Sequence, residues 1–116
     1  MALKYNFWLE VEDEVALSLW RVQLLTAVDQ TGSINQAAAQ MQVPYRIAWQ
    51  KIHEMEERLG QKLVETQTGG QSGGGTQLTT LAQNYIAQFN QISQEIESLL
   101  EQFSEAFTAP AFTPNE

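Results

Sequence analysis

The 116-residue sequence contains no cysteine and only one histidine, His53. Disulfide bonds and thiolate chemistry are therefore excluded, and a zinc site, which draws mainly on cysteine and histidine ligands, is not expected. No apolar run approaches the roughly 20 residues that a membrane-spanning helix needs, and no basic segment precedes an apolar one as in a signal peptide. These absences favour one small cytoplasmic domain with no metal, no cofactor and no membrane partner.

Basic residues are also scarce. The formal net charge is −8, with 6 Lys and Arg against 14 Asp and Glu. All the basic residues lie within the first 62 positions, and every charged residue after Lys62 is a glutamate. Proteins that bind nucleic acid usually carry a basic footprint, so this balance counts against DNA binding.

The chain is organised around residues 33–60, which predict two helices joined by a tight turn. Ser33 can cap the first helix in a capping box with Gln36. Pro44 suits the first turn of the second helix, and Gly60 is placed to end it. The apolar positions of that second helix share one face: Ala48, Ile52, Met55 and Leu59. The pattern is typical of a helix-turn-helix, whose second helix reads DNA, although two merely packed helices give the same signal.

Residues 63–80 predict two short strands around a glycine-rich loop. Leu63 and Val64 begin the first strand, residues 77–79 close the second, and Thr79 or Thr80 can cap the helix that follows. A hairpin placed directly after a recognition helix supplies the wing of a winged helix-turn-helix. A nucleotide-binding P-loop is not expected, because the GxxxxGK[ST] string is absent.

Residues 3–11 alternate apolar and mostly polar side chains, which predicts a strand with one buried face. The acidic residues 10, 12 and 14 would share its outer face, and we interpret them as a solvated edge rather than a metal site. A helix is expected over Ser18 to Thr31. Arg21, near its start, either touches a DNA phosphate or pairs with an acidic neighbour.

The last predicted element is a long helix over residues 81–107, which contains neither glycine nor proline. Its apolar residues repeat with heptad spacing, which favours a homodimer through this helix. The expected interface residues are Tyr85, Phe89, Ile92, Ile96, Leu99, Leu100 and Phe103. The glutamates beside them have no basic partners on the helix, so an antiparallel or offset pairing is preferred. Residues 108–116 are expected to be disordered.

Several motifs, in the order GSINQAAAQ, PYRIAW, LVE, TGG, GGG and LT, resemble the N-terminal winged-helix domain of ModE-type, molybdenum-responsive regulators. That domain is itself similar to the DNA-binding domain of LysR-type regulators. The resemblance covers about residues 3 to 105. It implies a homodimer built on the long helix, Tyr45 and Arg46 entering the major groove, and a wing that follows the phosphate backbone.

The resemblance also places the molybdate-binding domains after the long helix, where this chain ends, so molybdate sensing by this chain is not expected. Thr66 and Gln71 stand where basic wing residues are common, so the wing is expected to offer neutral donors to phosphate.

The sequence therefore predicts a mainly α fold with small β elements: a winged helix-turn-helix over residues 1–80 and a dimerisation helix over 81–107. The expected function is a sequence-specific, homodimeric, DNA-binding transcription regulator and not an enzyme. The alternative is a protein-interaction module that has kept this fold and lost DNA binding, and that pairs with a related regulator. Trp49 either faces DNA or packs in the core, and the core is the expectation for a tryptophan in a helix of this size. The expected DNA-binding residues are Arg21, Gln36, Pro44, Tyr45, Arg46, Gln50, Lys51, Thr68, Gly70, Gln71, Ser72 and Gly74.

Overall fold

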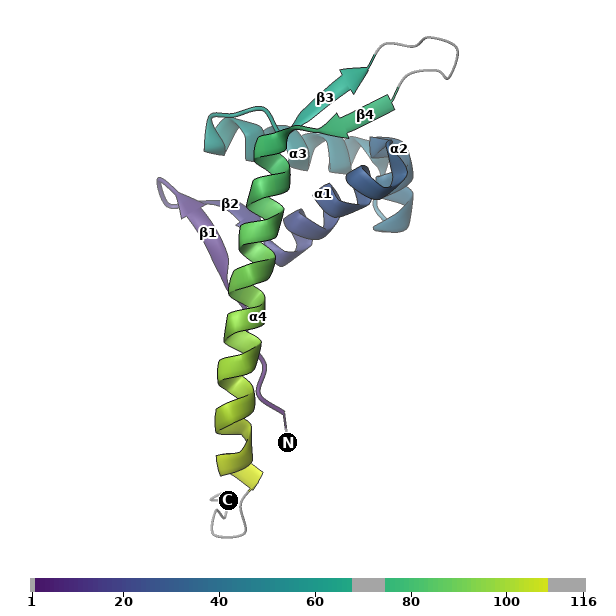
Figure 1. Ribbon diagram of the computed structural model, residues 1–116. Helices are drawn as coiled ribbons and strands as arrows, with labels where there is room; N and C mark the ends of the chain where they lie inside the picture. Colours follow the sequence, from purple (N-terminus) through teal and green to yellow (C-terminus); the bar gives the residue numbers. More distant parts are fainter. Residues whose placement is uncertain (1, 68–74, 109–116) are drawn as a thin grey trace.

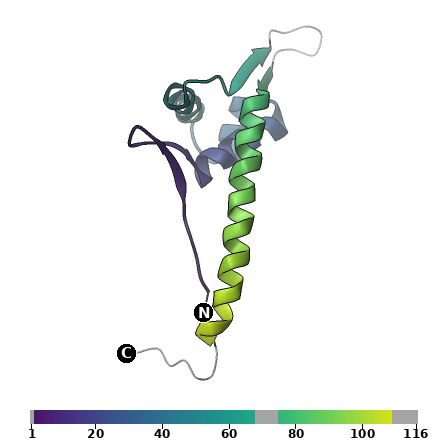
Figure 2. The same ribbon diagram turned by 60° about the vertical axis from the view of Figure 1, so that its left-hand side comes forward.

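The computed structural model describes residues 2–67 and 75–108 (Figure 1). In chain order the elements are β1 (Trp8–Val11), β2 (Glu14–Ser18), α1 (Leu19–Thr31), α2 (Ile34–Gln40), α3 (Tyr45–Leu59), β3 (Val64–Gln67), β4 (Gly75–Leu78) and α4 (Thr80–Thr108). The first three helices gather at one end of α4, which extends far beyond them (Figures 1 and 2). The predicted winged helix-turn-helix with a long C-terminal helix is confirmed. Within the described ranges, no helix is both long and apolar enough to cross a membrane.

Serine caps begin α1 and α2, and glycines in the left-handed region end α1 and α3. The Ser33 hydroxyl accepts a hydrogen bond from the Gln36 amide at 3.1 Å, and Gly60 ends α3 in the left-handed region with φ 69°, as predicted. The reciprocal half of the capping box is absent, because the Ser33 amide donates to the Thr31 hydroxyl instead. Pro44 lies just before α3, with an extended backbone, rather than in its first turn.

The core lies between α1, α3 and the base of the wing. Its largest fully buried side chains are Leu24, Leu25, Val28, Ile52, Met55 and Leu63. Each such side chain contributes about 1.5–3 kcal/mol through burial. Ala37, Ala38 and Ala48 are also buried, and their small side chains let α2 pack closely against its neighbours. This packing fixes the position of α3 within the domain.

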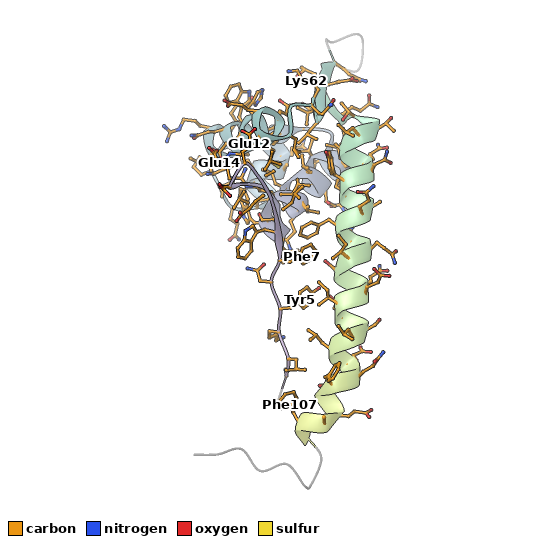
Figure 3. The ribbon with its side chains drawn as sticks, turned by 90° about the vertical axis from the view of Figure 1, so that its left-hand side faces the viewer. Tyr5, Phe7, Glu12, Glu14, Lys62 and Phe107 are labelled. Carbon is orange, nitrogen blue, oxygen red and sulfur yellow. The ribbon has the colours of Figure 1, made fainter. Side chains whose placement is uncertain are left out.

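The predicted single N-terminal strand is wrong in extent. Glu12 and Asp13 both have positive φ, 51° and 66°, and they turn the chain so that β2 pairs antiparallel with β1. Because the chain reverses there, the acidic residues do not share one strand face. Residues before β1 run beside α4 instead (Figure 3). The Phe7 ring stacks there on Phe89, with ring centroids 4.3 Å apart.

The predicted wing is confirmed as an antiparallel hairpin, in register from Val64↔Leu78 to Gln67↔Gly75. The Thr76 amide donates to the Gly32 carbonyl at 2.9 Å, which ties β4 to the turn between α1 and α2. Thr79 caps α4, since its hydroxyl accepts from the Ala82 amide. Predictions for the wing loop (Thr68, Gly70, Gln71, Ser72 and Gly74) and for the tail fall outside the described residues.

Candidate nucleic-acid interface

The first two turns of α3 present an exposed surface opposite the core. Ala48 and Ile52 face inward and are fully buried, whereas Tyr45 is 49% exposed and Arg46 and Gln50 are also exposed. Within residues 2–67 and 75–108, the Arg46 guanidinium takes part in no hydrogen bond or ion pair. A cationic side chain with five N–H donors is thus available at the start of this helix.

A groove of about 610 Å³ separates this surface from the wing. Tyr45, Trp49 and His53 line it from α3, and Lys62 and Glu65 are among the residues that line it from the wing. The prediction that Trp49 packs in the core is wrong, because its side chain is 46% exposed. The adjacent Ala48 takes the buried position instead. Trp49 stacks on His53, with ring centroids 3.8 Å apart, and His53 Nδ1 lies 2.8 Å from the Trp49 carbonyl oxygen.

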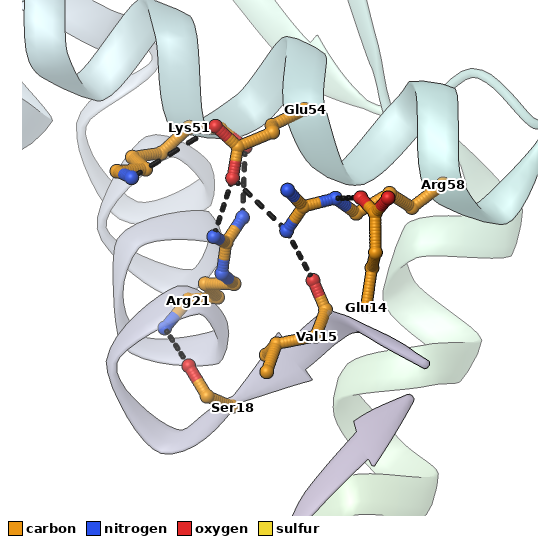
Figure 4. Close-up of polar contacts among 7 residues, drawn as sticks. All are labelled: Glu14, Val15, Ser18, Arg21, Lys51, Glu54 and Arg58. Atoms are coloured by element: carbon orange, nitrogen blue, oxygen red, sulfur yellow. Dashed lines mark hydrogen bonds and ion pairs between the residues drawn. The ribbon is translucent and has the colours of Figure 1, made fainter. Parts of the chain in front are cut away.

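Arg21 lies in the interior rather than at this surface (Figure 4). Its Nη2 is 2.7 Å from Glu54 Oε1, and its Nη1 donates to the Lys51 carbonyl at 3.4 Å. Of the two interpretations of Arg21, the pairing with an acidic neighbour is the one that the structure shows. Its guanidinium is therefore held inside the domain and is not part of the exposed surface of α3.

Glu54 also binds Arg58, whose Nη1 lies 3.1 Å from the same Oε1. Arg58 in turn donates to the Val15 carbonyl at 2.7 Å and pairs with Glu14 at 2.8 Å, which ties β2 to α3 (Figure 4). The Arg21 hydrogen bond holds the pKa of Glu54 below its usual range; partial burial opposes this, and nearby positive charges reinforce it. Two of the few basic residues in the chain, Arg21 and Arg58, are therefore paired within the domain.

Two other basic residues of this region, Lys62 and Lys51, are at least partly exposed. Lys62 is exposed at the base of the wing (Figure 3), and Lys51 is partly exposed with its Nζ 3.8 Å from Glu54 Oε2. Gln36 and Pro44 are exposed at the starts of α2 and α3. Trp49 and Lys62 are outside the set of expected DNA-binding residues, although Lys62 is one of the few basic residues that can meet a phosphate. Lys62 had a signal in the sequence, as the last basic residue before the wing.

The apolar residues that repeat with heptad spacing along α4, from Tyr85 to Phe103, form its apolar seam. One part of this seam packs on the domain and the other part is exposed to solvent. Phe89 is buried and Tyr85 is half-buried, and both pack against the domain core. By contrast, Leu99 is 51% exposed and Phe103 is 55% exposed, and Ile92 is similarly exposed. Ile96 and Leu100 are partly buried. The exposed part of the seam therefore begins beyond Phe89, on the section of α4 that extends past the other helices (Figure 1).

Three packed helices followed by a two-stranded wing define a winged helix-turn-helix domain. Residues 19–83 match the family of bacterial regulatory helix-turn-helix proteins, lysR family, and the chain belongs to that family.

Comparison with curated proteins agrees with the resemblance seen in the sequence. The chain is 37% identical over 97 residues to the molybdenum transport protein ModE of Azotobacter vinelandii, covering 84% of this chain and 36% of the relative. It is 38% identical over 74 residues to the DNA-binding transcriptional dual regulator ModE of Escherichia coli K12, covering 64% of this chain and 28% of the relative. The chain thus spans about a third of the length of the curated relatives it matches.

Solved structures show the same fold. The DNA-binding domain of BenM in complex with benA site 1 DNA superposes with a TM-score of 0.57 at 17% identity, covering 78% of this chain and 96% of that one. The CbnR DNA-binding domain in complex with DNA superposes with a TM-score of 0.56 at 20% identity, covering 77% of this chain and 95% of that one.

Proposed function

We propose that this chain is a sequence-specific DNA-binding transcription regulator that acts in the cytoplasm as a homodimer. The observation that carries the proposal is Arg46 at the N-terminal end of α3, which is exposed and has no partner among the described residues. The opposite face of this helix is held in the core. In a helix-turn-helix, side chains at this end of the second helix reach base edges in the major groove. The description of the Escherichia coli relative as a DNA-binding regulator supports the same function.

The exposed residues around Arg46 fit distinct roles at a duplex. Arg46 can bind guanine O6 and N7 through both arms of its guanidinium, and Gln50, one turn further on, can bind adenine through its amide. Lys51 and Lys62, which are at least partly exposed, would bind phosphates, and such contacts position the protein without reading sequence. The proposed contacts also include Tyr45, on the same surface, and Gln36 and Pro44, which are exposed at the starts of α2 and α3. For the wing loop, the sequence predicts neutral contacts to the backbone from Thr68, Gln71 and Ser72, with glycines 70 and 74 beside them.

A second copy of the chain is the partner that the exposed seam of α4 fits. Ile92, Leu99 and Phe103 lie on one side of a helix section that extends beyond the domain. Large apolar side chains in such a row mark an interface, and heptad spacing suits another helix. The proposed interface keeps Ile96 and Leu100 at its margin. It leaves out Tyr85 and Phe89, which pack within their own domain.

Selection of DNA from a random duplex library by the purified chain, at low salt, tests the proposal. We expect enrichment of one sequence with two related half-sites, as a symmetric dimer requires. Arg46→Ala protein, which keeps the fold, should enrich that site more weakly than wild type does. Failure of the wild-type protein to enrich any sequence would exclude this function. The alternative, a protein-interaction module, would then be favoured by the net charge of −8.

A further inference from the structure

The groove beside α3 is lined by aromatic rings, which the roles above do not explain. Tyr45 and Trp49 lie one turn apart, and each is close to half exposed, whereas Ile52 and Met55 on the same helix are fully buried. A tryptophan in the core would contribute far more to stability than one left at the surface. Paired apolar surface of this kind usually marks a contact site.

Trp49 is also fixed in place before any partner binds. His53 stacks against the indole at 3.8 Å with an interplanar angle of 23°, and its Nδ1 lies 2.8 Å from the Trp49 carbonyl. Because Nδ1 meets a carbonyl oxygen, it carries the proton and donates. A ring held in this way gives up little conformational freedom on binding, which favours affinity.

The chemistry of the major groove selects one ligand for such a ring. The base edges there present hydrogen-bond donors and acceptors, and the one apolar group among them is the C5-methyl of thymine. We propose that Trp49, with Tyr45 beside it, determines specificity by packing against a thymine methyl group in each half-site. This inference rests on the proposed DNA binding, and it assigns to Trp49 a reading role separate from that of Arg46.

The position of the aromatic pair agrees with this role. Both residues lie in the N-terminal half of α3, the end that approaches the bases in a helix-turn-helix. Basic groups border them, with Arg46 adjacent in sequence and Lys62 across the groove. An aromatic surface bordered by cations fits a nucleic acid better than it fits a basic protein partner.

Replacing thymine by deoxyuridine tests the inference directly, because it removes only the methyl group. Each thymine of the selected duplex is replaced in turn, and affinity is measured for wild type, Trp49→Ala and Trp8→Ala. Trp8 is the matched control, since it is a tryptophan that is 50% exposed on β1. Alanine is the best helix former, so the variant at position 49 should keep α3 intact, which circular dichroism checks.

We expect deoxyuridine at one thymine per half-site to weaken wild-type binding about fourfold, the effect of one buried methyl-sized group at about 0.8 kcal/mol. Trp49→Ala should bind the thymine and deoxyuridine duplexes equally, whereas Trp8→Ala should discriminate as wild type does. The two changes, Trp49→Ala in the protein and deoxyuridine in the DNA, form a double-mutant cycle. The difference between their combined effect and the sum of their separate effects measures the contact between the ring and the methyl group.

Unchanged wild-type affinity at every substituted thymine would overturn this inference while leaving the proposed DNA binding intact. So would full discrimination by Trp49→Ala, and the aromatic pair would then be a candidate protein contact. Absence of any selected duplex would overturn the inference and the proposed function together.

Discussion

Arg21 Nη2 on α1 lies 2.7 Å from Glu54 Oε1 on α3, so an ion pair joins the first helix of the domain to the helix that presents Arg46. The same carboxylate oxygen also pairs with Arg58, whose guanidinium donates a hydrogen bond to the Val15 carbonyl of β2. One glutamate therefore holds three elements in a fixed relation. The orientation of α3, on which any reading of DNA depends, is set partly by this polar network and partly by the apolar core.

Glu54→Gln should destabilise the domain, because it leaves two arginines without their shared anion. Hydrogen bonds to charged groups contribute about 1.5–3 kcal/mol each, and partial exposure reduces this, so we expect a loss of about 1–3 kcal/mol at pH 7. Urea denaturation measures it. Glu57→Gln, an exposed site on the same helix, serves as the control and should change stability little. Equal stability of the two variants would show that the network is energetically neutral.

The destabilisation caused by Glu54→Gln should depend on pH. The folded pKa of Glu54 is lowered, chiefly by its hydrogen bond from Arg21. The carboxylate therefore contributes its full stability above the unfolded glutamate pKa of about 4.3, and this contribution is lost as the pH falls through the folded pKa. The difference in unfolding free energy between wild type and variant should be constant from about pH 7 to 5.5 and shrink below about pH 4. A constant difference down to about pH 3 would contradict the assignment.

The parts of this fold that the sequence predicts depend on local chemistry. Ser33 and Gly60 mark helix ends because their requirements concern the nearest backbone groups. The wing follows from apolar residues around a glycine-rich segment. By contrast, the turn at Glu12 and Asp13 carries no glycine, so the second strand of the N-terminal hairpin gave no signal.

The candidate site was less predictable, because its features depend on contacts between distant segments. Arg21 and Glu54 are 33 positions apart, and nothing local distinguishes a paired arginine from one that faces DNA. Tryptophan is usually buried, and the apolar face that includes Ala48 did not by itself show that the neighbouring Trp49 is 46% exposed. Phe89 belongs to the heptad pattern, yet the N-terminal segment covers it first.

Arg46→Ala should lower the preference of the protein for its selected site over random DNA by about 1–3 kcal/mol, the value of one bidentate contact to a base. Melting temperature should hardly change, because the side chain is exposed and bonds to nothing else in the described part of the chain. Competition binding against both duplexes measures the preference. An equal loss of affinity for both would assign Arg46 to phosphate instead.

Lys62→Gln should weaken binding to all sequences alike, because a lysine at the base of the wing can meet phosphate. The slope of log affinity against log salt should become shallower by about 0.9 for each phosphate that the lysine neutralises in the wild-type complex. Lys4→Gln removes the same charge from the N-terminal segment, away from the groove, and should leave the slope unchanged. Equal slopes for the two variants would mean that only the net charge matters.

Phe89→Ala should destabilise the domain itself rather than its assembly. Phe89 is 5% exposed and stacks on Phe7, so its removal leaves a cavity between α4 and the N-terminal segment. Core replacements of this kind cost about 3–5 kcal/mol. Urea denaturation at several protein concentrations separates the two roles. If the destabilisation disappears as the protein concentration rises, Phe89 stabilises the dimer interface and not the single domain.

Leu99→Asp should convert the proposed dimer to a monomer without unfolding the domain. Leu99 is 51% exposed in the single chain, so aspartate there is solvated in the monomer, but in the dimer it would lie unpaired in the apolar seam. An uncompensated buried charge costs about 3–5 kcal/mol, which raises the dissociation constant by about two to four orders of magnitude. Gln94→Asp adds the same charge on another face of α4, outside the seam, and should remain dimeric. Sedimentation equilibrium at micromolar concentration compares the two. If Leu99→Asp remains dimeric, the interface lies elsewhere. If the wild type is already monomeric, the proposed dimer does not exist.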